Sequence, residues 1–572
     1  MIRIAHGPLL TLAFALATCG AATAAAPATR EPSLSVLLTP GRMDEAKGTG
    51  RLAVELRLSD TQLAAGAPLL TLPVVIANTA TIAETLTDLH ARDGDGDVPL
   101  TARDDETKGV VWSRHWVAGR AVRGPVVVTY VAPVDNTPPK RGSGPPYALR
   151  TEGQGVSGVG NTFILLPEEA LPRRIALRWD LKALPKGSTA TSSYGEGDVD
   201  LPVGPVDRLA STIFMAGPLH REPAAVSDGG FSSAWLGQPP FDPQPLMAWT
   251  NRLHGWMSGF FEDRSVPPYR VFLRYNPINA GGGTALTRSF LTTYGKDTQA
   301  DSLKGTLSHE MTHTWTESEA GQWYGEGIAV YYQARLPWRA GLISADEFLD
   351  DLNETARRYY SNALNATPDA QIAPRFWEDT RIRVLPYDRG GLYFAVLDGK
   401  IRRASGGKRS VDDLVREMNR RYAAGAPTTD AVWVELITRE LGEDGRKLHE
   451  AMIAGALMLP EAGDFGPCFT RTTAPARRFE LGFEPKSLVG TTKVIRGLDP
   501  ASEAAKTGLR DGDVVTYAVA MDAVQGDQQA TLTLQVTRDG KTFPITYLPR
   551  GETVEVYQWT RLPKTQQLQC VY

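Results

Sequence analysis

The pattern of apolar and polar positions changes twice along the chain, and its first stretch alternates as β-strands do. Between residues 30 and 210, short runs rich in Val, Leu, Ile and Thr are separated by Gly, Pro, Asp and Asn. A period of two is typical of half-buried antiparallel strands. The clearest runs are SLSVLLTP, RLAVELRLS, APLLTLPVVIA, RGPVVVTYVAP, GNTFILLP and RRIALRWDL. We therefore expect a β-sandwich-like domain over residues 25–210.

A helical period takes over between residues 211 and 465. Apolar side chains recur every three to four positions in segments such as DPQPLMAWTNRLHGWMSGFFED, DSLKGTLSHEMTHTW and SVDDLVREMNRRYAAG. Ser344 and Ser410 each precede acidic residues that suit a helix N-terminus, and Gly406 with Gly407 is a natural helix stop. One strand, PYRVFLRYNP at residues 268–277, stands alone among these helices. The pattern predicts a mainly helical domain with a small β part.

Strand signals return near the C-terminal end, where RRFELGFEP, GDVVTYAVA, ATLTLQVTRDGKTFPITYLP and ETVEVYQW surround one short helical piece. These runs predict a third domain over residues 466–572. A chain of 572 residues is also too long for one hydrophobic core, since single cores stop growing at roughly 250–300 residues. The expected fold class is multidomain α+β.

Composition and the N-terminal segment indicate which partners and which cellular compartment to expect. Net charge is -4, from 61 basic and 65 acidic side chains without a basic stripe, so we do not expect a nucleic-acid partner. Residues 1–24 combine a basic start, a short apolar stretch and an A-x-A site, which predicts a signal peptide too short for a transmembrane span. No later run is apolar enough to cross a bilayer. We expect a periplasmic or secreted protein; the alternative is a lipid anchor at Cys19, which has a lipobox-like position.

Two cysteines, Cys468 and Cys570, remain after removal of the predicted leader. In an oxidising compartment such a pair often forms a disulfide, which here would tie the C-terminus to the start of the third domain. Two independent thiols are the alternative, and the sequence leaves both open.

The strongest chemical signal is His309-Glu310-x-x-His313, which uses two of only eight histidines. Residues four apart lie on one helical face with Cβ atoms about 5–6 Å apart, so both imidazoles can bind one metal ion. Glu310 can then reach a water on that ion as a general base, the arrangement of zinc peptidases. The face expected to pack on the core carries Leu303, Leu307, Met311 and Trp315.

A catalytic zinc ion needs a third protein ligand, and Glu326 in WYGEG is the best candidate. It opens the next apolar-periodic run, so a turn over residues 317–325 would return it to the metal. Two histidines and one glutamate form a known catalytic zinc set. Glu317 and Glu319 are rival ligands, although we expect them to be solvated in the turn. One bound Zn²⁺ is the prediction.

With these motifs the chain resembles the glycyl aminopeptidase family of PDZ-bearing, thermolysin-like (gluzincin) zinc peptidases. The matching pieces are HEMTHTW, WYGEGIAVYY, YDRGGLYFAVLDGK and the C-terminal block. The resemblance implies a thermolysin-like domain over residues 211–465, with an edge strand, PYRVFLRYNP, above the metal, and a PDZ-like domain over residues 466–572. It makes His309, His313 and Glu326 zinc ligands and Glu310 the general base. Tyr387 of YDRGG would donate a hydrogen bond to the oxyanion of the tetrahedral intermediate.

The resemblance also bears on substrates and partners. It implies a peptide or unfolded-protein substrate, and the loop ELGF at residues 480–483 implies a C-terminal peptide ligand; use of the PDZ-like fold for packing alone is the alternative. In the family a glycine-rich strand leads to Leu-Glu-His, whereas here the glycines at 281–283 are followed by Thr284, Ala285 and Leu286. We expect a zinc peptidase, and the resemblance implies that it is an aminopeptidase. An endopeptidase and a non-catalytic peptide-binding protein remain alternatives.

Overall fold

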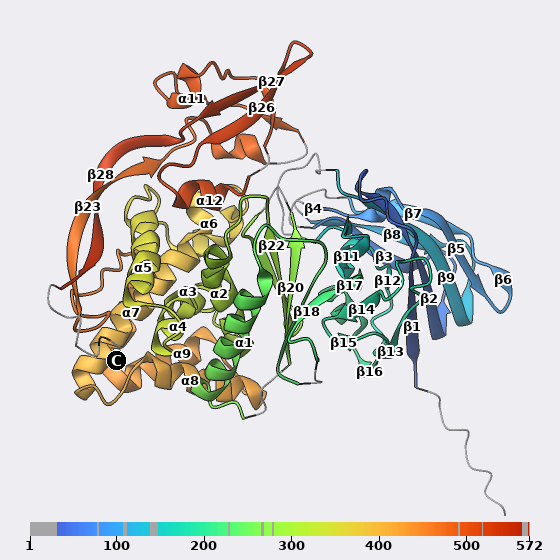
Figure 1. The fold of residues 1–572 in the computed structure, drawn as a ribbon, viewed down its shortest axis with the longest axis horizontal. Coiled ribbons are helices and arrows are strands. Elements are labelled where there is room, and N and C mark those ends of the chain that lie inside the picture. Colours follow the sequence, from blue (N-terminus) through green and yellow to red (C-terminus); the bar gives the residue numbers. More distant parts are fainter. Residues whose placement is uncertain are drawn as a thin grey trace, which may run out of the picture.

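The computed structural model describes residues 31–76, 79–106, 111–137, 147–226, 229–264, 268–276, 280–489, 492–517, 519–562 and 570. The predicted signal peptide and Cys19 lie outside the described residues. The described chain passes from a β-rich region through a mainly helical region to a second β region (Figure 1). The predicted order of β-rich and helical regions in a multidomain α+β protein is confirmed.

The N-terminal region holds two sheets around one core. Its seven-stranded sheet has the order β16-β13-β1-β2-β9-β5-β6, and a second sheet has the order β12-β3-β8-β7, with β4 beside β3. Their bounds are β1 (Ser33–Pro40), β2 (Thr49–Leu63), β3 (Pro68–Ile76), β4 (Thr79–Ala80), β5 (Thr87–Asp93), β6 (Gly96–Asp97), β7 (Leu100–Asp104), β8 (Trp112–Ala118), β9 (Val122–Asp135), β12 (Leu166–Pro167), β13 (Arg173–Trp179) and β16 (Val199–Gly204). Leu34 and Val36 of β1 and Leu70 of β3 belong to the same buried cluster, because alternate side chains of each strand point inward.

A third N-terminal sheet connects this core to the helical region. It has the order β10-β11-β17-β14-β15. Its strands are β10 (Arg150–Glu152), β11 (Gly155–Val159), β14 (Thr189–Ser192), β15 (Gly195–Glu196) and β17 (Ile213–Gly217). Phe214 of β17 packs into the N-terminal core, whereas Ile213 and Met215 pack against Phe272 and Leu291 of the next sheet. The alternation of one strand thereby buries both of its faces.

The predicted strand at 268–277 is neither alone nor at an edge. It is β20 (Tyr269–Tyr275), the central strand of a sheet with the order β18-β19-β20-β22-β21, and both of its neighbours run parallel to it. The other strands are β18 (His220–Glu222), β19 (Phe231–Trp235), β21 (Gly283–Leu286) and β22 (Ser289–Tyr294). The prediction of an edge strand here was wrong because a run buried on both faces fits a central strand. The edge strand beside the helices is β21, which begins at Gly283, the last glycine of the run at 281–283.

The helices cover the other side of this sheet (Figure 1). They are α1 (Pro243–Phe260), α2 (Lys304–Thr316), α3 (Gln322–Gln333), α4 (Arg335–Arg339), α5 (Ala345–Tyr360), α6 (Thr380–Arg383), α7 (Leu385–Ser405), α8 (Val411–Ala423), α9 (Asp430–Leu441) and α10 (Glu443–Ile453). Ser344 and Ser410 each form a capping box, and α7 ends at Gly406 in the left-handed conformation. The predicted caps and stop are therefore confirmed. Among the described residues, no helix combines the length and apolar character needed to cross a bilayer.

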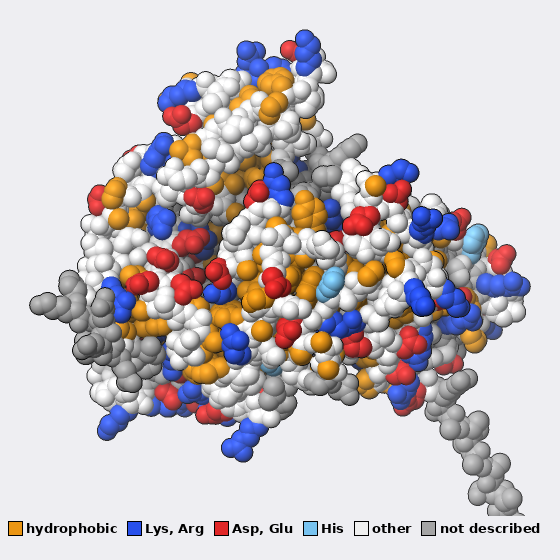
Figure 2. All heavy atoms as spheres, viewed as in Figure 1, with side chains coloured by type: hydrophobic (Ala, Val, Ile, Leu, Met, Phe, Trp, Pro, Cys, Tyr) orange, Lys and Arg blue, Asp and Glu red, His pale blue; other side chains and the backbone are white. Residues whose placement is uncertain are grey.

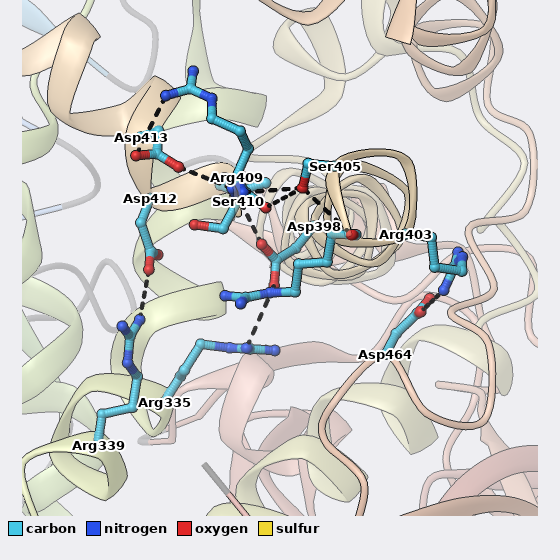
Figure 3. A network of polar contacts seen from close by, with 12 residues as sticks. Arg335, Arg339, Asp398, Arg403, Ser405, Arg409, Ser410, Asp412, Asp413 and Asp464 are labelled. Carbon is cyan, nitrogen blue, oxygen red and sulfur yellow. Dashed lines mark hydrogen bonds and ion pairs between the residues drawn. The ribbon is translucent and has the colours of Figure 1, made fainter. Parts of the chain in front are cut away.

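Buried ion pairs fix α7 and α8 against α4, which precedes them in the chain (Figure 3). Asp398 of α7 pairs with Arg335 of α4 at 3.7 Å and accepts a hydrogen bond from the backbone N–H of Val411 of α8 at 2.9 Å. Arg339 of α4 pairs with Asp412 of α8 at 2.7 Å. Removing one partner from such a pair leaves an uncompensated buried charge, so these contacts specify how the helices dock.

The C-terminal region consists of a long ribbon and a small sheet. The ribbon pairs β23 (Phe469–Phe479) with β28 (Arg550–Arg561), and the sheet has the order β24-β25-β26-β27. Its remaining elements are β24 (Lys493–Val494), α11 (Glu503–Lys506), β25 (Val514–Thr516), α12 (Met521–Gly526), β26 (Leu532–Arg538) and β27 (Lys541–Tyr547). Cys468 and Cys570 form a disulfide, which decides between the two alternatives for these residues. Both cysteines and Trp559 belong to the core of the helical region, so the base of the ribbon is anchored there.

Candidate active site

Helix α2 presents His309 and His313 because its opposite face is fixed in the core. Leu303, just before the helix, and Leu307, Met311 and Trp315 within it are at most 2% exposed, which confirms the predicted apolar face. Burial of such side chains stabilises the fold by roughly 1.5–3 kcal/mol each. The helix therefore cannot rotate without exposing them, and the two imidazoles stay directed toward α3.

Glu326 on α3 completes a cluster of three side chains, with His309 and His313, that could hold a metal ion. Its Oε2 lies 3.2 Å from His309 Nε2 and 3.5 Å from His313 Nε2, and the three donor atoms lie within 4.8 Å of one another. A tetrahedral ion with bonds of about 2.0–2.1 Å requires donor separations of about 3.3 Å. Two imidazole nitrogens and one carboxylate oxygen are also the donor set of catalytic zinc sites. Both the spacing and the chemistry of the cluster fit one Zn²⁺.

The rival ligands lie elsewhere, and α3 begins earlier than predicted. Glu317 is exposed and accepts a hydrogen bond from Tyr422, while Glu319 lies beside Thr428. Helix α3 starts at Gln322, so Glu326 lies inside it and the turn is shorter than residues 317–325. The prediction placed the start of α3 too late because Gly325, a poor helix former, interrupts the apolar pattern that begins at Trp323.

Two glycines allow the helices of the site to approach closely. A Cβ atom on Gly390 of α7 would lie 2.7 Å from the Cα atom of Gly327 of α3, a distance that real side chains do not tolerate. The close contact at this crossing brings Glu326 near Tyr387. Glu326 directly precedes Gly327 on α3, and Tyr387 lies three residues before Gly390 on α7. The glycines of WYGEG and YDRGG thus have a packing role that their sequence motif does not reveal.

Tyr387 lies beside the histidines, close to the start of α7. Its ring stacks on that of His309 with centroids 5.9 Å apart and planes 17° apart. Burial, together with the carboxylates of Glu326 and Glu310, raises the pKa of Tyr387 well above its usual value. The phenol therefore keeps its proton and remains a hydrogen-bond donor at neutral pH.

Glu326 of the cluster and the neighbouring Glu310 differ in how readily their carboxylates bind a proton. Burial acts to raise the pKa of Glu326, but hydrogen bonds to His309 and His313 outweigh it and hold that pKa well below its usual value. Burial raises the pKa of Glu310, against the effect of the two nearby histidines. An always-ionised carboxylate suits a metal ligand, and a carboxylate that binds a proton more readily suits a general base.

Gln333 and Asp351 support His309 and were missed in the sequence. His309 Nδ1 donates to Gln333 Oε1 at 3.1 Å, and Gln333 Nε2 donates to Asp351 Oδ1 at 2.8 Å. This fixes the tautomer of His309 and leaves Nε2 free to bind a metal ion. Gln333 follows Glu326 by two helical turns on the same face of α3, which is the signal that could have identified it. Asp351 comes from α5, and burial raises its pKa to about 7.

A groove of about 1010 Å³ extends from the metal site between α2, α3 and α5. His309 and Tyr387 form part of its wall, and Gly526 and Asp527 of the C-terminal region form another part. Its charged lining is mainly acidic and consists of Asp301, Lys304, Glu347, Asp350, Asp351, Glu354, Arg357, Arg358 and Asp527. Figure 2 shows acidic side chains gathered on this face of the molecule, over and beside α5.

The edge strand β21 borders the same site but carries no carboxylate. It contains Thr284 and Ala285, at the positions where the family pattern has its acidic residue. Thr284 Oγ1 lies 3.1 Å from the hydroxyl of Tyr147, which comes from the N-terminal region. Tyr147 is close enough to Glu310 for that carboxylate to act, with burial, to raise its pKa. The N-terminal and helical regions therefore both contribute residues near the cluster, and the C-terminal region contributes residues to the adjoining groove.

Comparison with solved structures shows which fold surrounds this site. An aminopeptidase N family protein from Idiomarina loihiensis superposes with a TM-score of 0.64 at 15% identity, covering 92% of this chain and 98% of that chain. The chain has the fold of that protein.

Two further similar structures superpose less closely. The M1 zinc metallopeptidase from Deinococcus radiodurans has a TM-score of 0.46 at 15% identity, covering 75% of this chain and 95% of that chain. Yeast LTA4 hydrolase has a TM-score of 0.46 at 12% identity, covering 75% of this chain and 69% of that chain. Neither a protein-family model nor a curated protein sequence matches the chain.

Proposed function

We propose that the protein is a zinc-dependent peptidase whose metal ligands are His309, His313 and Glu326. The observation that carries this proposal is the cluster of three donor atoms at the wall of a groove. Glu310 lies on the helix that carries the two histidines, and the ring of Tyr387 stacks on that of His309. The shared fold with an aminopeptidase N family protein supports it. A structural zinc site would close with a fourth protein ligand, whereas three ligands leave a position open for water.

The zinc ion would polarise the carbonyl of the scissile bond and lower the pKa of a bound water. Glu310 would act as the general base: its carboxylate would take a proton from the attacking water and deliver it to the nitrogen of the leaving amine. The hydroxyl of Tyr387 would donate a hydrogen bond to the carbonyl oxygen, which becomes negatively charged when the carbonyl carbon is attacked. Gln333 holds His309 in the tautomer and orientation that ligation requires.

The substrate is a peptide or an unfolded chain that lies along β21. An edge strand offers unpaired backbone groups, and an extended peptide can add to them without demanding particular side chains. Action at a free N-terminus is supported by the acidic lining of the groove, which suits a positively charged amine. Internal cleavage is supported by the absence of a carboxylate on β21.

We also propose that the protein is exported and that its C-terminal region is PDZ-like. The Cys468–Cys570 disulfide supports export, because such bonds persist in oxidising compartments. The compact sheet of β24 to β27 with its two short helices supports the second proposal. A peptide ligand of the loop at residues 480–483 belongs to the same proposal.

The proposal is tested by metal analysis of the purified protein, followed by hydrolysis assays on paired peptides with free and blocked N-termini. We expect one zinc per chain and hydrolysis that a chelator abolishes and zinc restores. Cleavage of free peptides alone would define an aminopeptidase, and equal cleavage of both would define an endopeptidase. Zinc-loaded protein that binds peptides without cleaving them would contradict the proposed catalysis.

A further inference from the structure

The corner between α6 and α7, which carries Tyr387, is held by a residue of the C-terminal region. Asp522 is the second residue of α12, and α12 lies against α5 and α6 (Figure 1). Its carboxylate pairs with Arg383 at 2.5 Å to Nη2 and 3.2 Å to Nε. The same oxygen accepts a hydrogen bond from the hydroxyl of Thr380. One carboxylate therefore holds both ends of α6.

Arg383 and Tyr387 lie on one stretch of helical backbone that runs from α6 into α7. Val384 alone separates α6 from α7, and the N–H of Asp388 donates to the C=O of Val384 at 2.9 Å. The N–H of Val384 in turn donates to the C=O of Thr380 at 3.1 Å. Helical hydrogen bonds thus continue across the corner, and a residue and the fourth after it share one face. A shift of Arg383 would move Tyr387 with it.

The other side of Tyr387 is fixed within the helical region. The carboxylate of Asp388 accepts hydrogen bonds from Arg358 of α5, the two shortest at 2.5 Å from Nη2 and 2.8 Å from Nε. Along the chain, Tyr387 therefore lies between two residues held by ion pairs: Arg383, whose pair crosses to the C-terminal region, and Asp388, whose pair stays inside the helical region. Arg358 and the adjacent Gly526 of α12 both line the groove.

Helix α12 is in turn attached to the core of its own region. Arg550, which is 3% exposed at the start of β28, donates to the C=O of Val524 at 2.6 Å. Val524 and Met521 are buried in the C-terminal core. The position of Asp522 consequently follows that of the whole C-terminal region.

We propose that the C-terminal region is a working part of the catalytic site, with Asp522 as the residue that positions Tyr387 through Arg383. This inference rests on the proposed peptidase function. A hydroxyl that must meet a developing oxyanion tolerates little displacement, since an error of about 1 Å can cost on the order of a hundredfold in rate. The C-terminal region would therefore influence the turnover rate without contacting the scissile peptide bond.

The experiment compares full-length Asp522→Asn with Asp346→Asn as the matched control. Asp346 also forms an ion pair with an arginine of the C-terminal region, Arg561, at 3.5 Å. Asp346, however, lies at the exposed start of α5, away from Tyr387. For Asp522→Asn we expect a fall in kcat on the order of tenfold to a hundredfold with KM changed less than about threefold. Zinc content and Tm should match the wild type, and the control should match it in all respects.

Two further measurements separate positioning from a general structural effect. In the Tyr387→Phe background, Asp522→Asn should cost less than about twofold in kcat, because its effect passes through the missing hydroxyl. In the metal-free protein, hydrogen exchange of the segment 380–390 should be faster in Asp522→Asn and unchanged in Asp346→Asn.

The outcomes distinguish this inference from the function on which it rests. Equal losses in the wild-type and Tyr387→Phe backgrounds, or unchanged exchange of the segment 380–390, would overturn the positioning role and leave the peptidase intact. A wild-type protein without chelator-sensitive hydrolysis would overturn both.

Discussion

The two halves of the candidate site are built in different ways. The metal half lies on α2 and α3, which are adjacent in sequence and are fixed by apolar side chains such as Leu307 and Met311. The donor half, Tyr387, lies at a helix corner fixed by polar contacts with α5 and with α12, a segment far along the chain. The metal half is thus local and hydrophobically anchored, whereas the donor half depends on how three distant segments assemble.

The largest expected effect comes from Glu310→Gln, which leaves the metal half in place but removes its base. Proton transfer by a positioned side chain contributes on the order of 10²–10⁴-fold to rate, so kcat should fall by that factor. Zinc content should not change, because the carboxylate is not a ligand. Elemental analysis and peptide hydrolysis measure both.

Glu317→Gln is the control for that variant, since Glu317 is exposed near the end of α2 and bonded to Tyr422. It should keep zinc and activity. If Glu310→Gln were as active as this control, Glu310 would not be the base.

Tyr387→Phe tests the donor half with the least change in shape. Removing one donor to an oxyanion costs on the order of 10²–10³-fold in kcat, and KM should change little. Tyr422→Phe also removes a hydroxyl, at a site away from the metal, and should remain at the wild-type rate. A Tyr387→Phe enzyme with unchanged kcat would assign oxyanion stabilisation to other groups.

Gln333→Ala tests whether the metal half needs support beyond its ligands. Loss of a hydrogen bond to a ligating histidine typically weakens metal affinity about 10–100-fold. Competition with a chelator should show this loss, while hydrolysis at saturating zinc falls less. Gln322→Ala, at the exposed start of the same helix, should keep full affinity; equal affinities of the two variants would refute the supporting role of Gln333.

Gly390→Ala should disturb the contact that joins the two halves. Its new Cβ would meet the backbone of Gly327 on α3, and such overpacking costs about 1–3 kcal/mol of unfolding free energy. Gly325→Ala, where a Cβ would have no neighbour within 4 Å, should be neutral or stabilising. Thermal unfolding of both variants measures the difference, and equal melting temperatures would show that the crossing is not tight.

The same division explains what the sequence could predict. His309, Glu310 and His313 were identified from spacing, and Ser344, Ser410 and Gly406 marked helix ends, because these features are local. The central place of β20 was missed, since its partners are chosen by pairing across the chain and not by its own residues. Tyr387 was identified only by resemblance, and its supports Arg358 and Asp522 were not found, because nothing near them in sequence indicates a contact with α7.

The most direct measurement is a crystal structure of the purified protein with data collected at the zinc absorption edge. We predict one anomalous peak bound by His309 Nε2, His313 Nε2 and a Glu326 oxygen at about 2.0–2.2 Å, with the fourth position occupied by water. An absent peak, or a zinc ion from which Glu326 points away, would contradict the account.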